Sequence, residues 1–227
     1  MHDRLNIKNK MNIKKSIIPR VIIPILIFAV ILNILRIIIW GKFSYLYLLW
    51  NILLAFVPYL ISLMLTYFHK EDKLNNFFLI LGSFFWLLFI PNAPYLITDF
   101  IHLDEVKHAP LLYDAFLLFS SALVGLLFGL FSISHIENLM KNKFSEKTTR
   151  IIMLILFVII GFGIYLGRFL RFNSWDFFTN HISIWSGISL LFSELGSVIN
   201  VILYTLLFSS FVFVSYKSWK YMNPSNI

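Results

Sequence analysis

Six apolar runs, each long enough to cross a bilayer, dominate the sequence and restrict what the chain can fold into. A span needs about 20 apolar residues, and a single segment in lipid must satisfy its own backbone, which favours a helix. The runs cover residues 17–40, 45–67, 74–97, 111–134, 151–170 and 196–216. We therefore predict an all-α, polytopic membrane helix bundle with six transmembrane spans.

The chain divides into three parts by composition. Residues 1–16 form a basic N-terminal segment, residues 17–217 the six-span transmembrane domain, and residues 218–227 a short tail. The stretch 182–216 is too long for one span, because a helix of that length would extend about 52 Å. Gly187 and Gly196 interrupt it, so a short extra helix, roughly 183–192, is predicted before the last span. Whether residues 182–192 are interfacial or re-entrant stays open.

Composition removes several classes of function. Only 13% of residues are charged, against about 25% in soluble domains. Cysteine is absent, which rules out disulfides and thiolate sites. The net charge of +8 does not indicate a nucleic-acid partner, because the aromatic residues lie inside the apolar runs. No haem, nucleotide or flavin motif is present. The predicted partner is the lipid bilayer, and the oligomeric state stays open.

Basic residues are unevenly divided between the two sides that six spans define. Fourteen of the 19 Lys and Arg residues lie on the side of both termini, and four lie on the other side: Lys42, Lys107, Arg168 and Arg171. Cytoplasmic loops of membrane proteins carry an excess of Lys and Arg. We therefore predict that the termini are cytoplasmic and that residues 99–110 are outside.

A pair of prolines interrupts the third run. The stretch FIPNAPYLITDFIHL contains Pro91 and Pro94. Proline removes a backbone donor and disfavours helical angles in the residue before it, here Ile90 and Ala93. Carbonyls freed by a break cannot face lipid, so they must be buried in protein, accept from a side chain such as Asn92, or line a wet cavity. The break predicts a protein-lined pocket near the outer face.

Asp99 and His102 follow the break and are three residues apart, so a short helix would present both on one face. They are candidate catalytic residues and, together with His181, candidate ligands of a divalent metal. The alternative is that Asp99 caps a short interfacial helix. The polar residues that come next are expected in a solvated loop: Asp104, Glu105 and His108.

A second polar stretch, GRFLRFNSWD, ends the fifth run. Arg168 and Arg171 are expected on one helical face. Three interpretations stay open: snorkelling to the interface, a clamp for an anionic group, or ion pairs with Asp99 or Asp176 that hold helix ends together. Ser174 is expected to cap the next helix. The predicted ligand-binding residues are Asn92, Arg168, Arg171, Asn173, Trp175 and Asp176.

Other polar residues near the spans have structural interpretations. Arg36 is expected to snorkel from the first span, the alternative being that it joins the outer polar group. Asp114 lies in the first turn of the fourth span, where the helix dipole favours a carboxylate. His69 and His135 are expected at the cytoplasmic boundary without partners.

Small residues recur at intervals of four in two spans. Ser121, Gly125 and Gly129 lie in the fourth span, and Gly163 and Gly167 in the fifth. This spacing lets helices approach closely in lipid. The two spans are therefore expected to contact each other or a shared neighbour.

Together, WLLFIPNAPYLITDFIHL and GRFLRFNSWD resemble the signature stretches of a bacterial integral-membrane family, Domain of Unknown Function 1361. The resemblance extends over residues 45–216 in span pattern. It implies a multi-pass protein of the bacterial cytoplasmic membrane, and it supplies no activity. The positions that it marks are Pro91, Asn92, Pro94, Asp99, His102, Arg168, Arg171, Asn173, Trp175 and Asp176.

Three classes of function fit these features. The first is a membrane protein whose outward polar pocket binds an anionic small molecule or lipid headgroup. The second is a membrane-embedded hydrolase or transferase that acts on lipid or envelope intermediates. The third is a small transporter or a structural or assembly subunit. No motif in the sequence commits the chain to catalysis.

Overall fold

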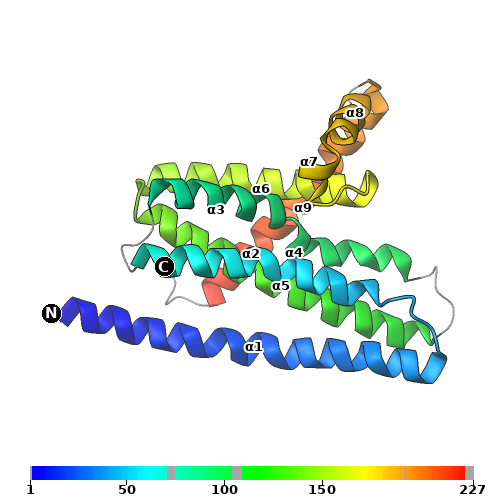
Figure 1. Ribbon diagram of the computed structural model, residues 1–227, viewed down its shortest axis with the longest axis horizontal. Helices are drawn as coiled ribbons and strands as arrows, with labels where there is room; N and C mark the ends of the chain where they lie inside the picture. The colour runs from blue at the N-terminus through cyan, green and yellow to red at the C-terminus, as the bar shows by residue number, and fades with distance from the viewer. Residues whose placement is uncertain (1, 71–74, 104–108, 192, 223–227) are drawn as a thin grey trace.

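The computed structural model of the chain describes residues 2–70, 75–103, 109–191 and 193–222 (Figure 1). These residues are almost entirely helical and include no strand. The residues 104–108, which include Asp104, Glu105 and His108, lie outside the described part. The elements are α1 His2–Trp40, α2 Tyr47–Lys70, α3 Asn76–Phe89, α4 Asn92–Tyr95, the 3₁₀ helix η1 Leu96–His102, α5 Leu111–Lys141, α6 Glu146–Phe169, α7 Asp176–Thr179, α8 His181–Leu191 and α9 Leu195–Met222.

Six of the helical stretches are long and apolar enough to cross a membrane, which confirms the predicted multi-pass bundle. The third of them, Asn76–His102, combines α3, α4 and η1. The short helix predicted before the last span is also confirmed, as α8.

Successive spans run in opposite directions (Figure 1), so two ends of the bundle can be defined. We call the end with Trp40, His102 and Arg168 the motif end, and the end with Lys141 and Lys220 the opposite end.

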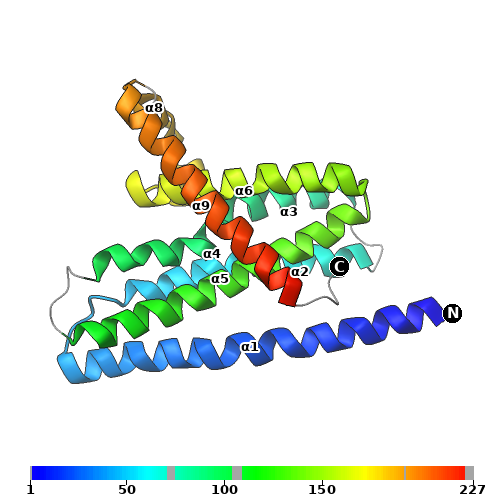
Figure 2. The same ribbon diagram turned by 180° about the vertical axis from the view of Figure 1, so that it is seen from behind.

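Helix α5 is the centre of the bundle. In its most apolar window 72% of residues are buried, against at most 39% in the other spans. It packs against α1, α2, α4 and η1, while α6 packs mainly against α9. Figure 2 shows α9 crossing α6 obliquely, so that α8 and the first turns of α9 project away from the other helices.

A buried ion pair joins α1 to α5 at the motif end. Arg36 Nε donates to Asp114 Oδ1 over 2.7 Å, and Nη2 donates to Oδ2 over 3.1 Å. Both side chains are only 1% exposed, and the guanidinium lies 4.5 Å from the Tyr45 ring centroid. The snorkelling interpretation of Arg36 is therefore wrong, because its charge is neutralised inside the bundle by a carboxylate on the neighbouring helix.

His135 is likewise not a boundary residue without partners. Its ring stacks on Tyr59 at 5.8 Å, and its Nδ1 lies 3.1 Å from Ser62 Oγ. The imidazole therefore belongs to the contact between α2 and α5.

The third span is broken where the prolines predict. Helix α3 ends at Phe89, and Asn92 Nδ2 donates to the Phe89 carbonyl over 3.1 Å. The Leu88 carbonyl accepts from Ser174 Oγ over 2.9 Å. Side chains thus satisfy the carbonyls at the break. Ile90 nevertheless keeps helical angles (φ −59°, ψ −32°), contrary to expectation, because the preference of the residue before proline is a bias that a kinked helix can override.

Glycines on two helices hold the broken segment between them. A Cβ added at Gly125 of α5 would meet the Ala93 carbonyl oxygen at 2.5 Å, and one added at Gly163 of α6 would meet Pro91 Cγ at the same distance. A Cβ at Gly167 would lie 3.2 Å from the Tyr95 ring. The expectation that both small-residue faces share a neighbour is confirmed, and the neighbour is α4.

We expect Gly163→Ala to lower the free energy of unfolding by about 1–3 kcal/mol, the usual cost of overpacking. The new methyl group would overlap the Pro91 ring, which cannot rotate away. Gly196→Ala in α9 is the control, since nothing lies within 4 Å of its Cβ position and alanine favours a helix. The two variants should change the melting temperature in detergent in opposite directions. Equal changes would contradict the close contact between Gly163 and Pro91.

Candidate functional site

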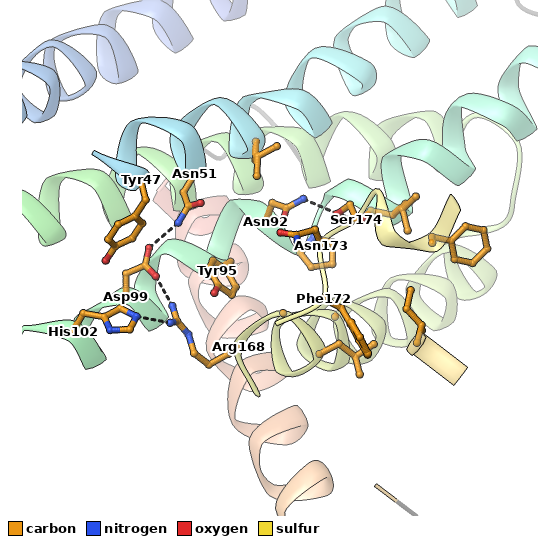
Figure 3. Close-up of a pocket in the computed structure, with 18 residues that line it drawn as sticks. Tyr47, Asn51, Asn92, Tyr95, Asp99, His102, Arg168, Phe172, Asn173 and Ser174 are labelled. Atoms are coloured by element: carbon orange, nitrogen blue, oxygen red, sulfur yellow. Dashed lines mark hydrogen bonds and ion pairs between the residues drawn. The ribbon is translucent and has the colours of Figure 1, made fainter. Parts of the chain in front are cut away.

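Arg168 is the centre of the motif-end site. It lies in the last turn of α6 and points toward η1 (Figure 3). Its Nε donates to Thr98 Oγ1 over 2.7 Å, its Nη1 lies 3.0 Å from His102 Nε2, and its Nη2 forms an ion pair with Asp99. The guanidinium carbon lies 4.6 Å from the Tyr95 ring centroid. One side chain thus joins the two polar stretches of the sequence.

Asp99 is held on both oxygens. Oδ1 accepts from Arg168, and Oδ2 accepts from Asn51 Nδ2 of α2 over 3.1 Å. The residue is 1% exposed. Asp99 does not cap a helix, because it lies inside η1 and its carboxylate is directed to α2 and α6. The pairing with Arg168 matches the third interpretation of the arginines, in which they hold helix ends together.

The 3₁₀ conformation of η1 sets the register of this contact. With three residues per turn, side chains three apart eclipse one another. Asp99 and His102 therefore project on one side of η1, toward Arg168. The expectation that they share a face is confirmed.

The contact with Arg168 also assigns the tautomer of His102. A guanidinium has only donors, so His102 Nε2 must accept and its proton must be on Nδ1. The His102 ring meets the Tyr47 ring edge-on, with centroids 6.1 Å apart.

The second polar stretch also contacts the break in the third span, through Ser174. Ser174 Oγ accepts from Asn92 Nδ2 over 2.8 Å while donating to Leu88 of α3. The expected cap of α7 by Ser174 is wrong, because this hydroxyl is used at the break in the third span. Asp176 Oδ2 instead accepts from the Asn173 backbone over 2.7 Å and stabilises the turn before α7.

These residues surround a cavity of about 430 Å³, which we call the motif-end cavity. The lining is partly polar and partly apolar, and we refer to these two sets of residues as the polar wall and the apolar wall. The polar wall consists of Tyr47, Asn51, Asn92, Asp99, His102, Arg168, Asn173 and Ser174. The apolar wall consists of Leu54, Leu88, Leu166, Phe172, Phe177 and Ile184.

Arg168 and Tyr47 contribute unfilled donors to the polar wall. The contacts above use three of the five N–H groups of Arg168. The Tyr47 hydroxyl is buried and has no hydrogen-bond partner among the described residues. Both oxygens of Asp99 are already engaged. The ion pair cancels its own charge, so any attraction for an anion comes from oriented donors.

Four of the predicted site residues do not line the cavity, and one of them is Asp176, which stabilises the turn before α7. Arg171 lies beyond the end of α6 with φ +57° and is exposed, so it does not share a helical face with Arg168. Trp175 packs edge-on against Trp50, with centroids 6.3 Å apart. His181 is exposed at the start of α8.

A metal site of three protein ligands is not formed by the described residues, since no three His, Asp or Glu side chains gather at one point. Asp99 and His102 are the pair brought together, through Arg168, while His181 does not line the cavity. A metal held by Asp99 and His102 stays a prediction.

Two residues of the polar wall were not singled out in the sequence. Tyr47 and Asn51 lie one turn apart at the start of α2 and reach the site from there. The available signal was Asn51 itself, because an amide inside an apolar span usually faces the bundle interior and has a partner.

Comparison with known proteins gives one match. The model of a family described as "Protein of unknown function (DUF1361)" matches residues 50–215. This range includes both polar stretches and all residues of the cavity except Tyr47. No curated protein and no solved structure matches the chain.

Proposed function

Because the chain belongs to the DUF1361 family, whose description assigns no activity, we propose its function from the site itself: the motif-end cavity binds an amphiphile with an anionic head. The observation that carries this proposal is the mixed lining of the cavity, which combines polar donors with apolar side chains. Donors of Arg168 and Tyr47 are suited to acceptor-rich phosphate or carboxylate oxygens. The apolar wall is suited to an acyl chain.

The engaged acceptors of the site favour binding over catalysis. A general base must have an acceptor within reach of the substrate proton. His102 Nε2 faces Arg168, and the Asp99 oxygens face Arg168 and Asn51. These contacts would have to open before either residue took up a proton, so we assign Asp99 and His102 to positioning Arg168. The hydrolase, transferase, transporter and assembly alternatives have no comparable support.

Tyr47→Phe tests the binding proposal without removing a charge. We expect the melting temperature of the unliganded protein to hold or rise, because the change removes a buried hydroxyl that lacks a partner. The affinity for phosphatidylglycerol in mixed micelles should fall about tenfold, as expected for a lost hydrogen bond to a charged group. Thermal unfolding without lipid gives the melting temperature, and the increase of that temperature with added lipid gives the affinity.

The matched control for this change is Tyr221→Phe, whose ring is 77% exposed near the end of α9. This control should bind the lipid like the wild type. Equal affinity of Tyr47→Phe and the wild type would remove the proposal, as would equal stabilisation by phosphatidylcholine.

We also propose that the motif end faces the outside of a bacterial cytoplasmic membrane, with both termini in the cytoplasm. The division of basic residues, fourteen against four, supports this orientation. An impermeant thiol reagent should label Phe43→Cys in intact cells and should label Asn142→Cys only after lysis. Both positions are exposed, and the chain has no cysteine of its own. The reverse pattern would invert the orientation.

A further inference from the structure

A second cavity, of about 230 Å³, lies at the opposite end of the bundle, which we call the opposite-end cavity. Its lining residues come from the end of α5, the start of α6 and the end of α9. The contact of Lys220 of α9 with Glu137 of α5 holds two of these helix ends together. It shares no lining residue with the motif-end cavity. Figure 2 shows these three helix ends on the side of the bundle away from α8.

Basic side chains outnumber acidic ones around this cavity. The cations are Lys141, Arg150, Lys217 and Lys220, and the carboxylates are Glu137 and Glu146. Lys220 contacts both oxygens of Glu137, at 2.8 and 2.9 Å, and the Tyr216 hydroxyl also donates to this carboxylate. Glu137 is therefore neutralised locally, and the remaining cations leave the cavity rim positive.

Thr149 supplies a second, independent feature of the site. Its side chain lines the cavity, the residue is 2% exposed, and its hydroxyl has no hydrogen-bond partner among the described residues. A buried hydroxyl without a partner loses its hydration, so it is normally satisfied by protein, water or a ligand. A ligand with acceptor oxygens at this point would satisfy it.

We propose that the opposite-end cavity binds a phosphate group, with Arg150, Lys217 and Thr149 as its contacts. Basic pockets between membrane helices suit the phosphates of anionic lipids. The lining also includes the apolar residues Leu154 and Phe213, which give an acyl chain a surface to follow. The shared chemistry is a phosphate anion, which either a phospholipid headgroup or free phosphate can provide.

The test counts the phospholipid molecules retained by the full-length protein. All proteins compared carry Tyr47→Phe, so that lipid bound in the motif-end cavity contributes equally to each count. Protein extracted from vesicles of phosphatidylcholine with phosphatidylglycerol is analysed by native mass spectrometry. The Arg150→Gln/Lys217→Gln variant should retain phosphatidylglycerol at least fivefold less often than its parent. Lys143→Gln/Lys147→Gln, which removes two exposed charges at the same end outside the cavity, should retain the parental amount.

Thr149→Val keeps the shape of the side chain and the charge of the cavity. Its melting temperature without ligand should hold or rise, and its phosphate or lipid affinity should fall about tenfold.

Thermal stabilisation by inorganic phosphate in uncharged detergent identifies free phosphate as a sufficient ligand, and stabilisation by phosphatidylglycerol alone identifies the headgroup. No stabilisation by either, or equal loss in the lysine control, would overturn the proposal while leaving the motif-end cavity unaffected.

Discussion

Replacing Arg36 by methionine is expected to lower the free energy of unfolding by about 3–5 kcal/mol, the usual result of removing one partner of a buried ion pair. The change leaves Asp114 with 1% exposure and without its bidentate partner in the packing of α1 on α5. The measurement is the melting temperature of the purified protein in an uncharged detergent.

Arg20→Met is the matched control for Arg36→Met, since it makes the same change in the same helix at an exposed position. It should stay within about 0.5 kcal/mol of wild type, as is usual for surface substitutions. The double variant Arg36→Met/Asp114→Leu removes both charges and should recover much of the loss. Equal stability of the two single arginine variants would show that the pair contributes nothing.

Arg168→Gln is expected to be the most damaging change at the motif end, with a loss of about 3–5 kcal/mol. Glutamine cannot reproduce the three contacts to Thr98, Asp99 and His102, and it leaves a buried carboxylate without a countercharge. Binding of phosphatidylglycerol should fall with it, because the guanidinium donors of the polar wall are lost.

Arg171→Gln separates this effect from a general loss of charge. Arg171 is exposed and lies outside the lining of the cavity, so its change should alter stability by about 0.5 kcal/mol or less. Combining Arg168→Gln with Asp99→Asn should destabilise less than the sum of the single changes, because both members of the pair are neutralised. Stability that holds in Arg168→Gln, with lipid binding lost, would contradict the ion pair as a structural contact.

The sequence was sufficient for the spans because each span is set by its own composition and length. The prolines marked the break in the third span, and the spacing of glycines indicated which faces approach closely. These features depend on residues close together in the chain. The extra helix before the last span could be predicted because the stretch 182–216 is too long for one span.

Pairings between distant residues could be predicted only in part. Arg36 and Asp114 are 78 positions apart, and each residue has an ordinary interpretation when considered alone. The contact of Asp99 with Arg168 was one of several open pairings, whereas Asn51 was missed. Arg171 was wrongly placed beside Arg168 because the sequence does not show that α6 ends at Phe169.

The 3₁₀ segment η1 has a consequence for how this protein can vary in evolution. Each residue of such a helix turns the chain by about 120°, so inserting or deleting one residue rotates everything beyond it by a third of a turn. A deletion between Pro94 and Asp99 would carry the carboxylate away from Arg168 and place another side chain there. Differences in length among relatives are therefore expected in the connections between spans and not in this segment.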